Sequence, residues 1–450
     1  MLEVADRPAV VARPWLAGYD PDVPVSLDYP DVRLDGLLRR SAARYPDQPA
    51  LVFYGRATTY RELDDAVDRL AGGFHRLGLR PGDRVALFMP NCPQLVASFS
   101  AIWRAGCVAV PVNPRASGPE LSRQLADAGA AAAIVLDRLW LRLRDVALPE
   151  TLRSLVVADA ADDLPFALRL GARIQALTSP RGSVVAEGAE VLRFRELARR
   201  GRAPTAAPAA GRRDPAPEHQ DPAGPGRAGP GRAGPGPDDP AVLLYTGGTT
   251  GLPKAAILTH RNLVANACQL AAWASSLDDG AEVMLSALPL AHGYAMTACM
   301  NISVLRGWTQ VLVPDPRDLE RLLDEIERWR VTVFPGVPTL YAAICDHPEV
   351  ASGKRNLHSI EACISGAAAL PAGIEDEFER LTGGRLVEGY GLSEASPATH
   401  CNPLGMGDRN GAIGLPLPDT DCRLVDVETE THEVGPGEPG VLCISGPQVM

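Results

Sequence analysis

The stretch from residue 241 to residue 254 constrains this chain more than any other. Its apolar run, Ala241 to Tyr245, predicts a short buried strand. A loop of three glycines and three threonines follows and ends at Lys254. Glycines let backbone N–H groups turn toward an anion, and hydroxyl groups and a lysine ammonium add donors that suit phosphate. The stretch therefore predicts a phosphate-binding loop rather than an ordinary turn. The expected phosphate contacts are Thr246, Gly247, Gly248, Thr249, Thr250, Gly251 and Lys254.

This loop differs from the Walker A motif of many ATPases. In that motif a glycine is followed directly by lysine and then by serine or threonine. Here Leu252-Pro253 separates Gly251 from Lys254, and Ala255 follows the lysine. Pro253 also disfavours a helix that begins directly on the glycines. We therefore expect a phosphate site of a different architecture.

Composition restricts the classes of function. The 450 residues carry a net charge of −11, so we expect no broad basic surface and no nucleic-acid partner. The nine cysteines form no C-x-x-C pair, which argues against a zinc site or disulfide framework and favours a reducing cytoplasm. The N-terminus shows no signal-peptide pattern. Arg104 and Gly106 interrupt the apolar stretch 95–112, so we expect membrane association to be peripheral at most. The oligomeric state is left open.

Strand-like and helix-like patterns alternate along most of the chain. Thr59 to Glu62 is a capping box that opens a helix with one apolar face, and Thr259 is expected to cap another helix. The alternation predicts an α/β fold with two doubly wound, mostly parallel sheets covered by helices. From about Gly411, short apolar runs alternate with Gly/Pro turns, which predicts a small β-barrel subdomain.

The expected domain boundaries follow from these patterns and from one change in composition. Residues 203–240 are dominated by Pro, Gly, Ala and Arg, which is typical of a disordered linker. The full division is an extended lead-in at 1–30, a first α/β subdomain at 31–202, the linker at 203–240, a second α/β subdomain with the ATP site at 241–400, and a small β subdomain at 401–450.

A second polar segment, from Glu388 to Glu394, follows a predicted strand. In open α/β sheets, ligands bind beyond the carboxyl ends of strands. Tyr390 can stack on a nucleobase, Ser393 can donate to a phosphate, and Glu394 can hold a magnesium ion. Taken alone, the segment fits a polar turn before a helix equally well. The expected nucleotide contacts are Glu388, Gly389, Tyr390, Gly391 and Ser393, with Glu394 as the metal ligand.

Two further turns follow predicted strands. The small residues Gly366, Ala367 and Ala368 permit a flat ring to lie against the backbone, although tight packing before a helix explains them equally well. His292 lies between a strand and a helix and can gate a pocket or assist a carboxylate, whereas a lone histidine is more often structural. We expect the acyl pocket around 292–300 and 337–341.

Together these segments resemble the AMP-forming acyl-CoA synthetases of the adenylate-forming superfamily. The resemblance covers nearly the whole chain from about Leu34, and residues 388–400 look most like bacterial long-chain fatty acid–CoA ligases. The segments in the order seen in that family are Thr246 to Lys254, His292, Gly366 to Ala368, Gly389 to Glu394 and the turn Gly411 to Pro418.

The resemblance implies a two-step reaction. A carboxylate attacks the α-phosphate of ATP and gives acyl-AMP and pyrophosphate, and coenzyme A then displaces AMP to form a thioester. The implied partners are a small-molecule carboxylic acid, expected to be a fatty acid, together with ATP, Mg²⁺ and coenzyme A. The resemblance implies catalytic roles for Lys254 as a phosphate ligand, for Glu394 as the magnesium ligand and for His292 beside the acid.

One feature departs from the family pattern. Members of the family carry a catalytic lysine in a small C-terminal domain beyond a hinge, and an aspartate that holds the ribose just before that hinge. These 450 residues contain only Lys254 and Lys354, and neither matches that lysine, so we expect this chain alone to be impaired in catalysis. The alternatives are a non-catalytic nucleotide- or acyl-binding module, an acyl-AMP ligase that serves a carrier protein, and an aryl-CoA ligase.

Overall fold

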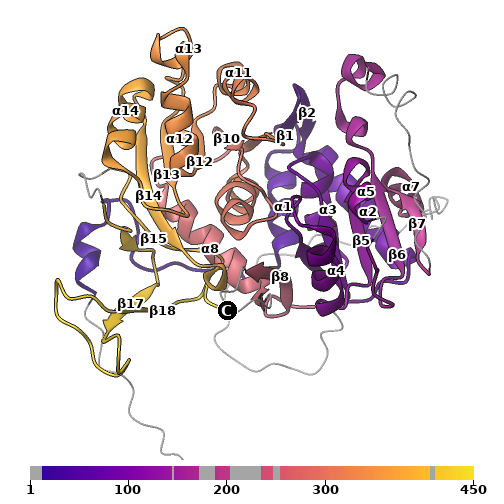
Figure 1. The fold of residues 1–450 in the computed structure, drawn as a ribbon, viewed down its shortest axis with the longest axis horizontal. Helices are drawn as coiled ribbons and strands as arrows, with labels where there is room; N and C mark the ends of the chain where they lie inside the picture. Colours follow the sequence, from indigo (N-terminus) through magenta and orange to yellow (C-terminus); the bar gives the residue numbers. More distant parts are fainter. Residues whose placement is uncertain (1–12, 144–145, 172–187, 203–234, 247–253, 406–410) are drawn as a thin grey trace, which may run out of the picture.

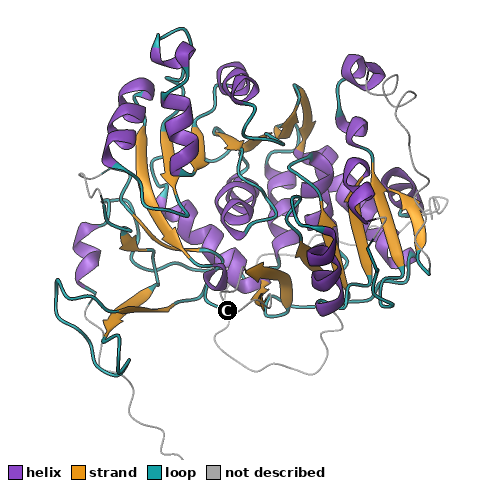
Figure 2. Cartoon of the chain, viewed as in Figure 1, coloured by secondary structure: helices purple, strands orange, loops and turns teal. Residues whose placement is uncertain are grey.

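Two β-sheets with helices between and outside them organise the fold (Figure 1, Figure 2). The structure is a computed structural model that describes residues 13–143, 146–171, 188–202, 235–246, 254–405 and 411–450. The strands are β1 (Pro49–Phe53), β2 (Arg56–Thr59), β3 (Arg84–Phe88), β4 (Val108–Pro111), β5 (Ala132–Leu136), β6 (Ser154–Ala158), β7 (Glu190–Arg193), β8 (Pro240–Thr246), β9 (Lys254–Thr259), β10 (Val283–Ser286), β11 (Thr309–Leu312), β12 (Val333–Gly336), β13 (Ala362–Ser365), β14 (Arg385–Gly391), β15 (Ala398–Cys401), β16 (Leu415–Pro416), β17 (Asp421–Val425) and β18 (Val441–Ser445).

Helices alternate with these strands. The α-helices are α1 (Leu34–Arg44), α2 (Tyr60–Arg76), α3 (Pro93–Arg104), α4 (Gly118–Asp127), α5 (Trp140–Leu143), α7 (Phe194–Arg200), α8 (His260–Trp273), α9 (Gly293–Ala295), α10 (Ile302–Arg306), α11 (Leu319–Trp329), α12 (Pro338–Cys345), α13 (Pro348–Ala351) and α14 (Ala372–Thr382). Shorter helical segments are η1 (Pro14–Gly18), η2 (Asp137–Leu139), η3 (Ala160–Asp163), the π-helical η4 (Met296–Asn301) and η5 (Ser393–Ala395).

The buried side chains show five layers, α/β/α/β/α. Neighbouring residues of a strand point to opposite faces of its sheet. Leu87 on β3 therefore packs between the two sheets, whereas Phe88 packs on the outer face with α4 and α5. On β10, Met284 faces the same central core and Leu285 faces an outer core with α11 and α12. Helices α1, α2, α3, α8 and α10 contribute to the central core.

Parallel pairing dominates both sheets, as predicted. The seven-stranded sheet has the order β7-β6-β5-β3-β4-β8-β9, and only its edge pair β8–β9 is antiparallel. The nine-stranded sheet has the order β16-β15-β14-β13-β12-β10-β11-β1-β2. The two predicted helix caps are confirmed, because Thr59 accepts from the Glu62 N–H and Thr259 from the Asn262 N–H. The α/β fold class is therefore confirmed.

The sheets do not follow the division of the sequence near residue 240. Strands β8 and β9 lie after that division but join the first sheet through β4, and β1 and β2 lie before it but join the second sheet through β11. The expectation that the two α/β units follow one another along the chain therefore needs this correction. Hydrophobic periodicity identifies a strand, but it carries no information about which sheet edge the strand joins.

The two ends of the described chain pack together. The Tyr19 hydroxyl donates to the Pro416 carbonyl at 2.6 Å, and Arg13 forms a 2.7 Å ion pair with Asp421. Strands β17 and β18 form a two-stranded antiparallel sheet, so a closed barrel is not formed by the described part of 401–450. Most of the predicted linker lies outside the described residues, and β8 already begins at Pro240. No described helix is long and apolar enough to cross a membrane.

Candidate active site

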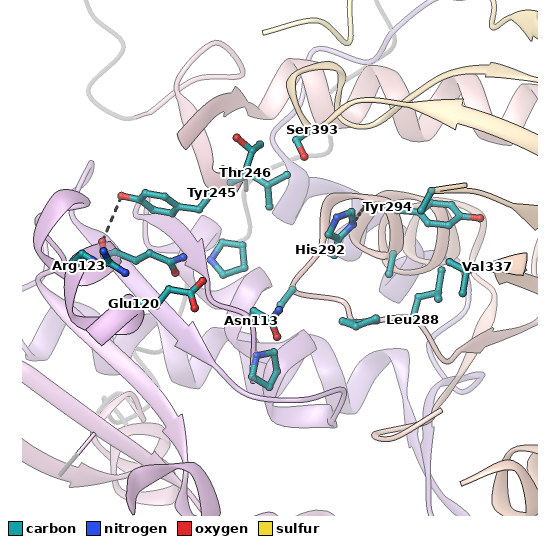
Figure 3. A pocket seen from close by; sticks show the side chains of 18 residues that line it. Asn113, Glu120, Arg123, Tyr245, Thr246, Leu288, His292, Tyr294, Val337 and Ser393 are labelled. Atoms are coloured by element: carbon teal, nitrogen blue, oxygen red, sulfur yellow. Dashed lines mark hydrogen bonds between the residues drawn. The ribbon is translucent and has the colours of Figure 1, made fainter. Parts of the chain in front are cut away.

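A cleft of about 640 Å³ lies at the carboxyl ends of strands from both sheets (Figure 3). Because the parallel strands of a sheet end at one edge, the loops that follow them converge there. The lining residues come from the ends of β4 and β8, from the segments after β4, β10, β12, β13 and β14, and from α4. They are Pro111, Asn113, Pro114, Glu120, Arg123, Gln124, Leu244, Tyr245, Thr246, Leu288, Pro289, Ala291, His292, Tyr294, Ala295, Val337, Ala367 and Ser393.

The end of β8 carries the start of the predicted phosphate loop into this cleft. Thr246 lines the cleft, and its hydroxyl donates to the Lys254 carbonyl at 3.3 Å across the base of the β8–β9 hairpin. Gly247, Gly248, Thr249, Thr250 and Gly251 lie outside the described residues. The backbone after Lys254 continues as β9 and not as a helix, which agrees with the expectation from Pro253. Tyr245 fixes the end of β8, since its hydroxyl donates to Asp127 on α4 at 2.6 Å.

The His292 side chain lines the cleft on the side opposite α4 (Figure 3). It caps α9, and its Nδ1 accepts from the Tyr294 N–H at 3.2 Å. Desolvation by the surrounding walls lowers the pKa of His292, so the imidazole is neutral near pH 7. A neutral ring that accepts at Nδ1 carries its proton on Nε2. His292 therefore offers one N–H donor to an anionic oxygen in the cleft.

Tyr294 forms the wall next to the small-residue turn. Its hydroxyl donates to the Ile364 carbonyl at 2.6 Å, and burial raises its pKa well above the ordinary value. A Cβ atom built on Gly366 would lie 3.0 Å from the Tyr294 ring, so glycine at this position allows the close approach. Ala367 lines the cleft with a φ of +72°, whereas Ala368 is exposed and does not line it.

The segment after β14 approaches the cleft through Ser393. The carboxylate of Glu388 on β14 accepts from the Leu370 N–H at 3.4 Å, which joins β14 to the segment after β13. A Cβ atom on Gly391 would lie 2.1 Å from the Pro397 carbonyl oxygen, so this glycine is required for packing of β14 against β15. The ring of Tyr390 lies edge-to-face with His400, at 6.0 Å between centroids.

The described residues contain no group of three or more His, Cys, Asp or Glu side chains placed to hold a metal ion. Glu394 is exposed next to Ser393, which lines the cleft, and its carboxylate makes no hydrogen bond or ion pair within the described part of the chain. Magnesium in nucleotide sites is usually held by one or two carboxylates together with substrate phosphates and water. A single free carboxylate at this edge fits that mode of binding.

The structure brings together four of the predicted residues from distant parts of the sequence. Thr246, His292, Ala367 and Ser393 all line one cleft. Gly366 supports it through Tyr294, and Glu388, Gly389, Tyr390 and Gly391 lie on β14 behind it. Lys254 begins β9 at the base of the hairpin and is exposed.

Sequence reasoning missed the wall that α4 supplies. Glu120 and Arg123 face the cleft together with Asn113, which lies two residues after the end of β4 (Figure 3), and Gln124 also lines it. Gln124 is 7% exposed, and its Oε1 has no hydrogen-bond partner among the described residues. The position of Asn113 at the carboxyl end of a parallel strand was the available signal.

A family model and individual proteins match this chain. The model for the AMP-binding enzyme family matches residues 38–450. The chain is 37% identical over 442 residues to a long-chain-fatty-acid–CoA ligase from Bacillus subtilis. The aligned region covers 97% of this chain and 73% of that protein. It is 32% identical to a feruloyl-CoA synthase from an Amycolatopsis species, over 91% of this chain and 69% of that protein.

Solved structures match the fold at lower identity. A long-chain-fatty-acid–CoA ligase from Archaeoglobus fulgidus superposes with a TM-score of 0.74 at 22% identity, over 96% of this chain and 77% of that one. An anthranilate–CoA ligase solved with anthranoyl-AMP gives a TM-score of 0.75 at 23% identity, over 95% of this chain and 71% of that one. At these identities the two superpositions support the fold alone.

Proposed function

This chain belongs to the AMP-binding enzyme family, and we propose that it activates a carboxylic acid, foremost a long-chain fatty acid, with ATP and transfers the acyl group to coenzyme A. The observation that carries the proposal is the single cleft lined by Thr246, His292, Ala367 and Ser393. These residues come from four loops, and together they offer hydroxyl and imidazole donors beside a flat, small-residue surface.

In the first step, an oxygen of the carboxylate attacks the α-phosphorus of ATP. The bond between the α-phosphorus and the bridging oxygen breaks, and pyrophosphate leaves. Thr246 stands at the end of β8, and Lys254 at the start of β9, so both can bind the departing phosphates. The Nε2–H of His292 can donate to the acid and hold it against the nucleotide.

In the second step, the sulfur of the thiol attacks the acyl carbon, and AMP leaves with the bridging oxygen. No bond to the protein forms in either step, so the contribution of the residues is to position charges and to exclude water. Glu394 and the substrate phosphates would hold a magnesium ion, which offsets phosphate charge when bound.

The acid would extend past Tyr294 toward the central core. This core contains a small cavity of about 20 Å³, which is lined by apolar residues that include Trp273, Ala298, Ile302 and Ile364. An apolar lining suits an alkyl chain, whose burial is favourable in proportion to its area. A cavity of this size would have to widen to admit an alkyl chain, and the acyl pocket expected around residues 292–300 and 337–341 stays a prediction.

Carboxylate-dependent exchange of labelled pyrophosphate into ATP tests the proposal. A protein that extends these 450 residues through the C-terminal domain that the family resemblance implies should catalyse exchange with a long-chain fatty acid and without coenzyme A, and thioester should form only when the thiol is added. A panel of fatty and aryl acids should give the highest kcat/KM for a fatty acid. Absence of exchange with every acid in the panel would refute the proposal. Equal thioester formation on a carrier protein and on coenzyme A would refute the proposed acceptor.

A further inference from the structure

A buried amide from the first sheet bonds to the loop that leads to His292. Asn91 lies three residues after β3 and is 3% exposed. Its side chain reaches the ends of β10 and β11 in the second sheet, because its Nδ2 donates to the Ser286 carbonyl at 2.9 Å and to the Val313 carbonyl at 3.2 Å. Asn91 therefore joins the two sheets at the edge where their parallel strands end.

The same amide holds the middle of the loop between β10 and α9. The Asn91 Nδ2 donates to the Leu288 carbonyl at 2.8 Å, and the Leu290 N–H donates to the Asn91 Oδ1 at 2.8 Å. Both leucines are buried. Within the described residues, neither backbone group has another hydrogen-bond partner. Buried backbone groups require a partner, so these two bonds determine the path of the loop.

His292 comes two residues after this fixed point. Its N–H donates to the Pro289 carbonyl at 2.9 Å, so the turn that carries the imidazole closes onto the part of the loop that Asn91 holds. Its carbonyl accepts from the Met296 N–H at 2.9 Å. The side chains of Leu288 and His292 both line the cleft (Figure 3). A displacement of Leu290 would therefore displace the imidazole.

The imidazole itself has few contacts that could resist such a displacement. Its Nδ1 accepts from the Tyr294 N–H at 3.2 Å, and no described residue bonds to Nε2. The direction of the Nε2–H therefore depends on the backbone on both sides of His292. A catalytic group that moves by about 1 Å can lose on the order of 100-fold in rate.

A second buried amide in the core provides a matched comparison. Gln269 on α8 is fully buried, its Nε2 donates to the Pro418 carbonyl at 2.7 Å, and its Oε1 accepts from Asn266 at 3.0 Å. None of its hydrogen bonds to described residues involves the loop 287–292. Removal of Gln269 should therefore cost stability, as removal of Asn91 does, without moving His292.

We propose that Asn91 is a positioning residue for acyl adenylation, which fixes the loop 288–292 and thereby directs the Nε2–H of His292 toward the acid. The role of His292 in the reaction rests on the proposed function, whereas the fixed orientation of the imidazole does not depend on it. The inference extends that function by making the loop after β3, on the first sheet, a support for a donor on the second sheet.

Nitrogen NMR of the histidines tests the orientation without any reaction. The 450-residue protein is labelled with ¹⁵N in its eight histidines, and His292→Ala identifies the His292 signals. At about pH 7.5 the wild type should show His292 in one neutral form, with the proton on Nε2. Asn91→Ala should show both neutral forms, whereas Gln269→Ala should keep the wild-type signals. Unchanged His292 signals in Asn91→Ala, or a wild-type proton on Nδ1, would overturn the proposal.

Pyrophosphate exchange in the protein extended through the C-terminal domain tests the consequence for the reaction. Asn91→Ala should lower kcat with a fatty acid by about 100-fold and change the KM for ATP less than about two-fold. In a His292→Ala background the same substitution should change kcat less than about three-fold, because Asn91 acts through His292. Gln269→Ala should lower kcat less than about three-fold in either background.

The double-mutant comparison separates positioning from a merely structural role. Loss of the same factor with and without His292 would overturn the proposal. Urea unfolding shows which variants are folded under the assay conditions. If Asn91→Ala is unfolded, Asn91→Ser replaces it in both experiments, with an expected loss in kcat of about ten-fold because a short donor remains. Absence of exchange in every protein, the wild type included, would count against the proposed function, and the NMR result would then decide the role of Asn91 alone.

Discussion

Replacement of Tyr294 tests how the wall of the cleft is held. The Tyr294 hydroxyl donates to the Ile364 carbonyl at 2.6 Å and lies 3.3 Å from the Gly336 carbonyl oxygen. In Tyr294→Phe this donor is lost. The Ile364 carbonyl keeps a second donor, the Tyr341 hydroxyl at 3.2 Å, but that hydroxyl also donates to the Phe334 carbonyl at 2.7 Å. The carbonyl is therefore only partly satisfied in the variant.

The expected cost follows from this geometry. A buried acceptor that loses its partner costs about 1–3 kcal/mol, and the remaining Tyr341 donor moves the expected loss for Tyr294→Phe to about 1–2 kcal/mol. Tyr294→Ala also removes the ring that packs against Gly366, so we expect a loss of about 3–5 kcal/mol. Urea unfolding of both variants against the wild type measures these free energies.

Kinetics then separate positioning from stability. Tyr294→Phe keeps the ring, so we expect its KM for the fatty acid to change less than about two-fold. Tyr294→Ala should raise the KM for the fatty acid by about ten-fold without changing the KM for ATP. Equal destabilisation by both substitutions would refute the role given to the ring. A loss below about 0.3 kcal/mol in Tyr294→Phe would refute the role given to the hydroxyl.

Three further predictions concern pH, metal and backbone packing. Burial lowers the pKa of His260 to about 3, so between pH 6.5 and 3 the unfolded chain binds a proton that the folded chain does not, and the free energy of unfolding falls as the pH falls. Between pH 7 and pH 5, His260→Gln should therefore lose about 2 kcal/mol less of its unfolding free energy than the wild type. Urea unfolding at each pH measures this difference, and equal losses would contradict the prediction. Glu394→Ala should abolish magnesium-dependent ATP binding in calorimetry while magnesium-free binding stays the same, and unchanged binding with magnesium would remove Glu394 from the metal site. Gly391→Ala should destabilise the protein by about 2 kcal/mol or more, because its Cβ would lie 2.1 Å from the Pro397 carbonyl oxygen. The control Gly373→Ala in α14 has open space around its Cβ and should be neutral or stabilising. Thermal melts that rank the two variants in reverse would refute the packing argument.

Local features of the fold were predictable because short-range physics determines them. The caps at Thr59 and Thr259 require only a hydroxyl and an acceptor three residues later, and both formed as expected. Strand β8 was recognisable because five apolar residues precede a glycine-rich loop. The pairing of β8 with β4 in the first sheet, and of β1 with β11 in the second, was not predictable, since edge pairing depends on contacts between residues far apart in sequence.

The candidate site was predicted in part for the same reason. Thr246 ends a strand, His292 and Ser393 follow strands, and each carries a donor, so each was visible as a local pattern. The α4 residues Glu120 and Gln124 lie on an amphipathic helix, where polar residues ordinarily face solvent. Their exposure to the cleft depends on how the two sheets pack against each other.

The most direct test of the account is the fate of the carboxylate oxygen. When a fatty acid labelled with ¹⁸O in both carboxylate oxygens is converted to its thioester, attack on the α-phosphorus followed by displacement at the acyl carbon transfers one ¹⁸O to AMP. Mass spectrometry of the AMP should therefore find one ¹⁸O per molecule. AMP without label, or label in pyrophosphate, would contradict acyl adenylation in this cleft.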